Sequence, residues 1–143
     1  MSGATAPGTG AASGPGRALV ALYGVLAIAA TSRSGVQILR DFDAAPLAYS
    51  LSAAAALVYV VATVALARGA RRVAWVAVCF EAVGVLVVGT LSLVRPELFP
   101  DATVWSGFGI GYGFVPLVLP ALGLWWLVRT RDGRPTPDGA VAR

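Results

Sequence analysis

Four long stretches of this chain are almost entirely apolar, and polar residues gather in the short segments between them. The stretches cover residues 18–39, 45–67, 73–94 and 103–128. A helix of about 20 apolar residues spans hydrocarbon about 30 Å thick, since each residue adds about 1.5 Å. The helix-period or strand-period alternation of a water-exposed surface is missing from them. The pattern predicts an all-α fold, a polytopic membrane four-helix bundle.

The composition supports this prediction and limits what else the chain contains. Hydrophobic residues make up 57% of it and charged residues 13%, too few to cover a water-soluble surface. Four spans leave no room for a separate soluble catalytic domain. We expect one transmembrane domain over residues 17–129 and a disordered cytoplasmic tail over residues 130–143. Residues 1–16 carry no charge and no aromatic side chain, which predicts a second disordered tail.

The first apolar stretch has two interpretations. Residues 18–32 are short for a span, and residues 27–29 (Ala-Ile-Ala) resemble the cleavage site of a signal peptide. Continuing the helix through Arg33 to Leu39 gives the length of a span. The long uncharged leader and the tyrosine inside the stretch favour a retained helix. Arg33 then lies in the outer half of the membrane, where its long side chain reaches toward the headgroups.

The arginines predict the orientation of the spans. If all four stretches cross, the N-terminal tail, the 68–72 loop and the C-terminal tail share one side. That side holds most of the basic residues, namely Arg17, Arg68, Arg71, Arg72, Arg129, Arg131, Arg134 and Arg143. Because basic residues keep flanking loops in the cytoplasm, we expect a multi-pass protein of the cell (inner) membrane with an N-in/C-in arrangement. The net charge of +4 has this topological origin, so no nucleic-acid partner is expected.

Several kinds of chemistry are excluded by residue type. The chain has no histidine, which removes Ser-His and Cys-His nucleophile pairs and the commonest zinc ligand. Its single cysteine, Cys79, allows neither an intramolecular disulfide nor a CxxC pair. We therefore expect no catalytic residue, no cofactor and no metal site.

Glu81 is the one acid inside an apolar stretch, and it defines the candidate intramembrane polar site. It lies about 12 Å from the inner end of the third stretch, at the helical rise per residue. Tyr59 in the second stretch reaches a similar depth, and Thr63 lies one turn below it. Tyr112 belongs to the same candidate site because Pro116 frees its carbonyl. Arg33 lies higher and would have to reach down to pair with Glu81.

Two roles for Glu81 remain open from the sequence. An ionisable group in hydrocarbon is costly and needs a partner, which makes it a functional-site hypothesis by default. A carboxyl that stays neutral there suits a proton-coupled carrier. It suits a structural hydrogen bond between helices equally well.

The fourth stretch contains the glycines Gly107, Gly109, Gly111 and Gly113. They form two interleaved GxxxG spacings, which predict close packing against a neighbouring helix. Glycine also lowers helix propensity, so a locally loosened or bent helix is the alternative. The tryptophans at the ends of the third and fourth stretches, Trp75, Trp105, Trp125 and Trp126, are interpreted as anchors at the headgroup level.

Three segments together resemble a group of small four-helix integral membrane proteins of high-GC Gram-positive bacteria. They are TSRSGVQIL, APLAYSLSAAAALVYVVATVAL and PELFPDATVWSGFGIGYGFVPLVLP. The resemblance covers nearly the whole chain after the tail, implies no activity and carries no site residues over. The small multidrug transporters also have four helices and a lone membrane glutamate. They place that acid in the first helix, whereas Glu81 lies in the third stretch.

We therefore expect a non-enzymatic accessory or interaction protein in the lipid bilayer, as a homo-oligomer or with another membrane protein. The first alternative is a small oligomeric proton- or cation-coupled transporter that uses Glu81. The second is a membrane enzyme acting on a lipid or isoprenoid substrate. Its paired acids would come from the loops, either Asp41 with Asp43 or Glu97 with Asp101.

Overall fold

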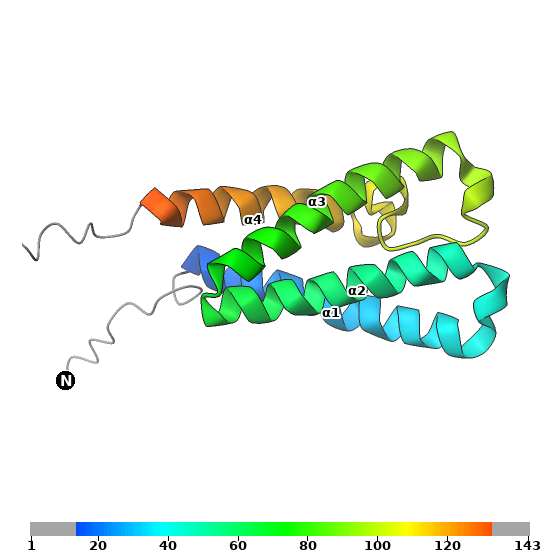
Figure 1. The fold of residues 1–143 in the computed structure, drawn as a ribbon, viewed down its shortest axis with the longest axis horizontal. Coiled ribbons are helices and arrows are strands. Elements are labelled where there is room, and N and C mark those ends of the chain that lie inside the picture. Colours follow the sequence, from blue (N-terminus) through cyan, green and yellow to red (C-terminus); the bar gives the residue numbers. More distant parts are fainter. Residues whose placement is uncertain (1–13, 133–143) are drawn as a thin grey trace, which may run out of the picture.

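The computed structural model describes residues 14–132, which fold into four α-helices and four short 3₁₀ turns without a strand among them. The α-helices are α1 (Gly14–Asp41), α2 (Pro46–Arg68), α3 (Arg71–Val94) and α4 (Val115–Asp132) (Figure 1). The 3₁₀ turns are η1 (Phe42–Ala44), η2 (Pro96–Leu98), η3 (Ser106–Phe108) and η4 (Ile110–Tyr112). The all-helical fold class is confirmed.

Both expected tails fall mostly outside the described residues. Where they overlap with these residues, the prediction of disorder is wrong: residues 14–16 begin α1 and residues 130–132 end α4. Pro15 is compatible with the first turn of α1, where its missing N–H has no helical partner to lose.

The first three helices match the first three predicted spans. Each is long and apolar enough to cross a membrane. α1 continues without a break through Arg33 to Asp41, which is the extension that a span requires. α2 and α3 begin and end within two residues of the predicted bounds. Three apolar helices of spanning length are therefore a property of this fold.

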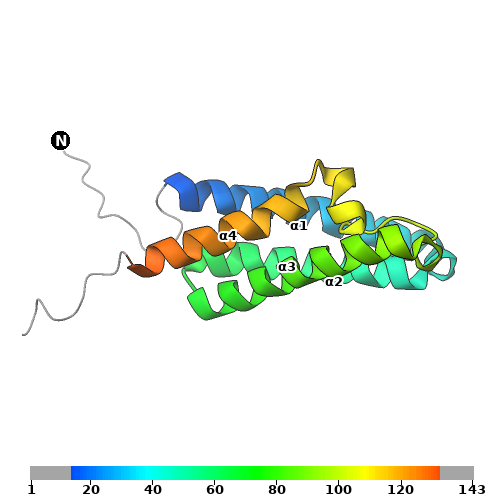
Figure 2. The ribbon, with the colours of Figure 1, turned by 90° about the horizontal axis from the view of Figure 1, so that it is seen from above.

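The four helices lie around a common core in chain order. α1 packs on α2, α2 on α3 and α3 on α4, and α4 returns to α1, so that α1 and α3 face each other across the diagonal. The two views agree with this arrangement (Figures 1 and 2). The first turn of α1, the α2–α3 turn and the last turn of α4 lie at the same end of the molecule. We call this the basic end because Arg17, Arg68, Arg71, Arg72 and Arg129 lie there.

The α2–α3 turn has a local cause. Gly69 takes the left-handed conformation, with φ of 70°, at the C-terminus of α2. The Gly69 N–H bonds to the Leu66 carbonyl and the Ala70 N–H bonds to the Ala65 carbonyl, so two of the last carbonyls of α2 are satisfied. A glycine is favoured here because a side chain at positive φ is strained.

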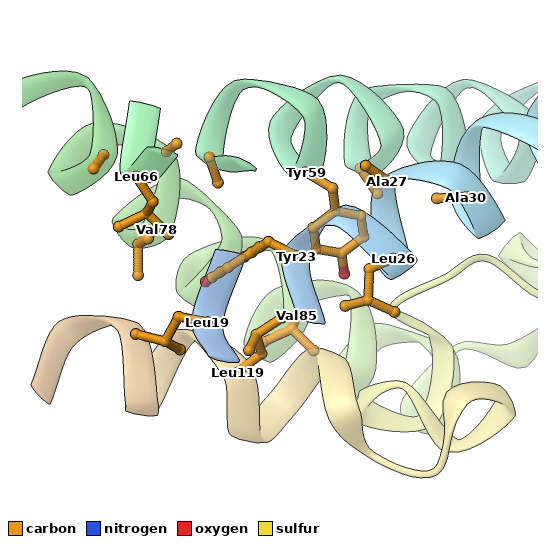
Figure 3. Packing of buried hydrophobic residues seen from close by; sticks show 14 of the residues in the cluster. Leu19, Tyr23, Leu26, Ala27, Ala30, Tyr59, Leu66, Val78, Val85 and Leu119 are labelled. Atoms are coloured by element: carbon orange, nitrogen blue, oxygen red, sulfur yellow. The ribbon is translucent and has the colours of Figure 1, made fainter. Parts of the chain in front are cut away.

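Small side chains bring α1 and α2 together. Ala30 of α1 and Ala55 and Ala62 of α2 are almost fully buried. Small residues let two helix backbones approach closely, which is how helices associate where surrounding lipid is as apolar as their own side chains. Larger side chains fill the middle of the core, among them Tyr23, Tyr59, Val85 and Leu119 (Figure 3).

The fourth predicted span is wrong as one continuous helix. Residues 103–114 form turns, and the direction of η3–η4 differs from that of α4 by 99°. Positive φ angles occur at Phe108 and Phe114 as well as at Gly107, Gly109 and Gly113. Glycines favour such conformations, and Pro116, which has no N–H to donate to a preceding turn, fits the first turn of a helix, so α4 begins only at Val115. We call residues 103–114 the glycine segment.

The GxxxG interpretation fails together with that helix. The glycines no longer lie four apart on a helical face. Gly109 instead lies against the ring of Pro116, while a Cβ added to Gly111 or Gly113 would meet nothing within 4 Å. The alternative of a bent segment describes the structure better.

Candidate functional site

Glu81 lies in the middle of the core, on the face of α3 that is turned toward the other helices. Its side chain is 0% exposed. The α3 residues one turn away on either side of Glu81, namely Ala77, Val78 and Val85, are also buried. Helical periodicity along α3 therefore carries Glu81 inward and leaves Phe80 and Val83 on the outer surface.

The partner of Glu81 is Tyr23 of α1. The Tyr23 hydroxyl donates a hydrogen bond of 2.7 Å to Oε2 of Glu81. Both side chains are 0% exposed. Because α1 and α3 occupy diagonal positions, this bond crosses the centre of the core and connects two helices that share little other contact.

Tyr23 was not among the predicted site residues, although the sequence carries a signal for it. α1 and α3 both start at the basic end and run in the same direction. Counted from Gly14 and Arg71, Tyr23 and Glu81 lie about 14 to 15 Å along their helices at the helical rise.

Tyr59 lies beside this pair without bonding to Glu81. Its ring centroid is 6.3 Å from that of Tyr23, with the ring planes tilted by 49°. Such a tilted arrangement is favourable for two aromatic rings. The Tyr59 hydroxyl instead accepts a hydrogen bond of 2.9 Å from Nε1 of Trp105. Tyr59 therefore connects the Tyr23–Glu81 pair to the glycine segment.

Trp105 is not an anchor at the headgroup level, and that interpretation is wrong for this residue. It is 2% exposed and reaches from the glycine segment into the core. A Cβ added to Gly84 of α3 would lie 2.6 Å from the Trp105 ring, so the absence of a side chain at Gly84 makes room for the indole. Trp126 is buried too, whereas Trp125 is half exposed and lies under the guanidinium of Arg129.

The other predicted site residues make their contacts with groups other than Glu81. Thr63 donates a hydrogen bond of 2.6 Å to the Tyr59 carbonyl of its own helix. Arg33 donates to the Ala102 carbonyl at 3.0 Å and does not pair with Glu81. Tyr112 is partly buried and packs against the core from the glycine segment. The structure thus brings Tyr59 beside the Tyr23–Glu81 pair, whereas Thr63 and Arg33 make no hydrogen bond to it.

One oxygen of Glu81 has no partner. Within residues 14–132, Oε1 of Glu81 is buried and accepts or donates no hydrogen bond. The one ion pair in the same part of the chain joins Arg95 to Glu97 at the surface. Arg71 is held by the Leu127 carbonyl and the Thr130 hydroxyl. Glu81 therefore has a hydroxyl donor on one oxygen and no basic side chain bonded to the other.

A second polar network fixes the glycine segment at the end opposite the basic end. The Tyr49 hydroxyl donates to Oδ2 of Asp101 at 3.0 Å. The Gly107 N–H donates to the Ser92 hydroxyl at 2.8 Å. With the Arg33 bond to Ala102, these contacts connect α1, α2 and α3 to the glycine segment and the two residues before it. They hold the segment in place where α-helical hydrogen bonds are absent.

The loop acids have separate partners. Asp101 accepts from Tyr49, whereas Glu97 accepts from Arg95. The hydrogen bond from Arg95 lowers the pKa of the exposed Glu97 carboxyl. In the described part of the chain, no three His, Cys, Asp or Glu side chains come together in a way that suits a metal ion.

The outward face of α3 has a shallow apolar hollow, lined by Trp75, Val76, Cys79, Phe80 and Val83. Glu81 does not line it, since its side chain leaves the opposite side of the helix. The hollow and the buried carboxyl are therefore separate features of α3.

Comparisons with known proteins add no further assignment. No protein-family model matches the chain, and searches of curated proteins and of solved structures found no match either. The site is therefore interpreted from its own chemistry. A lone carboxyl, a phenol donor and apolar walls can form a hydrogen-bonded link between helices or bind a small cation.

Proposed function

We propose that this chain is a four-span protein of the cell (inner) membrane, with both ends in the cytoplasm. The glycine segment and α4 together form the fourth span. Two observations support the orientation: the arginine-rich turns share the basic end, and Asp41, Asp43, Glu97 and Asp101 lie in the opposite loops. Basic residues favour the cytoplasmic side of a membrane.

Cysteine labelling tests this orientation. Cys79 is replaced by serine, and single cysteines are introduced at the exposed positions Asp43, Leu98 and Ala70. A membrane-impermeant thiol reagent added outside intact cells is expected to label positions 43 and 98 and to spare position 70. Labelling at position 70 alone would reverse the orientation.

Within the membrane, we propose that the chain acts as a non-enzymatic accessory or interaction protein. The observation that carries this proposal is the Tyr23–Glu81 hydrogen bond across the diagonal of the core. A bond of this kind holds α1 and α3 in one arrangement, and interhelical hydrogen bonds are a common use of polar side chains among membrane helices. A fixed arrangement of helices gives a partner in the bilayer a constant surface to bind.

The second candidate is a small proton- or cation-coupled transporter. The observation that favours it is the buried Oε1 of Glu81, which lacks a partner within the described residues. Ionisable groups inside membrane proteins commonly mark ion pathways. The glycine segment adds support, because interrupted helices line the binding sites of many transporters.

Glu81→Gln separates the two candidates. Glutamine keeps the size of the side chain and an oxygen that accepts from Tyr23, and it cannot release a proton. For the interaction protein, we expect this variant to fold and to restore the phenotype of a deletion strain. For the transporter, we expect it to fold and to lose pH-driven flux in proteoliposomes. Wild-type proteoliposomes without flux would refute the transporter, while a folded variant that fails to restore the phenotype would refute the interaction protein.

Tyr112→Phe is the matched control for these assays. Tyr112 is partly buried near the same part of the core, and no hydrogen bond of its hydroxyl joins it to the rest of residues 14–132. We expect the control to behave as wild type in both the complementation and the flux assay.

A further inference from the structure

The unpartnered oxygen of Glu81 raises the question of what neutralises the negative charge that this carboxyl would carry when ionised. The side chain is 0% exposed, and Oε1 is without a hydrogen-bond partner in the described structure. A carboxylate buried in this way would be an uncompensated charge, which is among the most unfavourable situations in a protein interior. Something of positive charge must therefore accompany the carboxyl.

The side chains around Glu81 do not supply that charge. α1 contributes Tyr23 and α2 contributes Tyr59. The glycine segment contributes Trp105, which bonds to Tyr59, and Tyr112, which packs against the same core. These groups are neutral phenols and an indole at ordinary pH.

α4 and the nearest arginines do not supply it either. α4 places Gly123 beside the Tyr23 hydroxyl and buries Pro120 one turn away, and neither residue ionises. Arg33 and Arg71 bond to backbone carbonyls elsewhere. The balancing charge therefore does not come from a described arginine.

The donor set also disfavours a metal ion. Calcium and magnesium take about six or more oxygen ligands, and such ions bind where carboxylates and carbonyls converge. Here one carboxyl oxygen is free, and no cluster of three potential ligand side chains exists within residues 14–132. A proton needs a single oxygen, and it removes the charge completely.

We propose that Glu81 is a proton-binding site, with the proton on Oε1 and the Tyr23 hydroxyl donating to Oε2. The proposal deepens the carrier candidate by naming its ion, and it rests on the placement of the core inside a membrane. It holds equally for an interaction protein, in which the bound proton keeps the core neutral. Tyr23 then serves as the residue that positions the carboxyl.

Infrared spectroscopy tests the proposal without requiring flux. A protonated carboxylic acid has a carbonyl stretch above the amide I region, whereas a carboxylate does not. We expect wild-type protein in lipid bilayers at neutral pH to show this band and Glu81→Gln to lose it. Glu97→Gln is the control, since the exposed Glu97 is ionised beside Arg95 and its replacement leaves the band unchanged.

A hydrophobic carbodiimide provides a second test on the wild-type chain, so the result does not depend on whether a variant folds. The acid O–H adds across one C=N bond of N,N′-dicyclohexylcarbodiimide to form an O-acylisourea, which rearranges to a stable N-acylurea without a leaving group. The reaction needs the protonated acid. Peptide mapping by mass spectrometry is expected to find the adduct on Glu81, with less labelling as pH rises.

The infrared and carbodiimide results test the proton site independently of whether the protein transports anything. A carboxylic acid band assigned to Glu81 supports the proton site even if no flux is found. Absence of the band at neutral pH overturns it, as does carbodiimide labelling that appears only after sodium and other metal cations are removed. Wild-type protein that shows the band but no flux in proteoliposomes would refute the carrier and leave the proton site in place.

Discussion

The Tyr23 hydroxyl and Oε2 of Glu81 are 2.7 Å apart, in a core where both side chains are fully buried. The bond joins α1 to α3, the two helices that lie across the diagonal. Tyr59 packs against the Tyr23 ring, and its hydroxyl accepts a hydrogen bond from Trp105. Glu81 is thus connected, directly or through its neighbours, to α1, α2 and the glycine segment.

Replacing Tyr23 with phenylalanine tests the strength of this link. The variant keeps the ring and leaves both oxygens of Glu81 without a donor. We expect the free energy of unfolding to fall by about 1 to 2 kcal/mol, the range for an interhelical hydrogen bond and an unsatisfied buried acceptor. Unfolding in bicelles gives the value, with Tyr112→Phe as the control. An unchanged stability would mean that the bond contributes nothing to holding α1 against α3.

Gly84→Ala tests whether Trp105 depends on the space beside α3. The added Cβ would lie 2.6 Å from the indole ring, so Trp105 has to move. We expect a loss of about 1 to 3 kcal/mol, as for other overpacked cores. Tryptophan fluorescence is expected to shift as the indole leaves its buried position.

Gly35→Ala in α1 is the matched control for that change. A Cβ at Gly35 meets nothing within 4 Å, and alanine is favoured over glycine in a helix by up to about 1 kcal/mol. We expect unchanged fluorescence and equal or higher stability. A Gly84→Ala variant that behaved like this control would show that Trp105 does not occupy the space beside Gly84.

Two glycines of the fourth stretch are expected to respond differently to alanine. Gly109 has a φ of 84°, and a Cβ added to it would lie 2.7 Å from the Pro116 ring. Gly109→Ala is therefore expected to cost about 1 to 3 kcal/mol. Gly111 has open space and no positive φ, so Gly111→Ala is expected to be nearly neutral. Equal effects in a thermal unfolding assay would instead favour the continuous GxxxG helix.

Alanine variants of Arg71 and Arg72 distinguish a structural role of the Arg71 side chain from the effect of its charge on membrane orientation. Arg71 donates to the Leu127 carbonyl and the Thr130 hydroxyl near the end of α4, while Arg72 is exposed. Each alanine variant removes one positive charge from the same turn, so orientation is affected equally. We expect Arg71→Ala alone to lose about 1 to 2 kcal/mol and to speed amide hydrogen exchange in the last turns of α4. Identical exchange in both variants would rule out the structural role of Arg71.

The first three helices were predictable because their cause is local. Each contains enough consecutive apolar residues for a span, and each ends where arginine, glycine or proline interrupts the stretch. The fourth stretch was equally apolar but broke at Val115. Hydropathy indicates how well a segment is tolerated in lipid, but it does not indicate backbone geometry. The break in the fourth stretch is instead indicated by the glycines before Pro116, three of which have positive φ angles.

Composition and order along the chain determined the span-length apolar helices, the excess of arginines at one end and the isolation of Glu81 among apolar residues. These are properties of residue type and of sequence distance. Only the packed structure selected Tyr23 rather than Tyr59 as the donor to Glu81, and only it placed Trp105 in the core. The reason is geometric: the partner of a buried side chain depends on how each helix is rotated about its axis and on which helices are diagonal. That rotation is fixed by all four helices packing together.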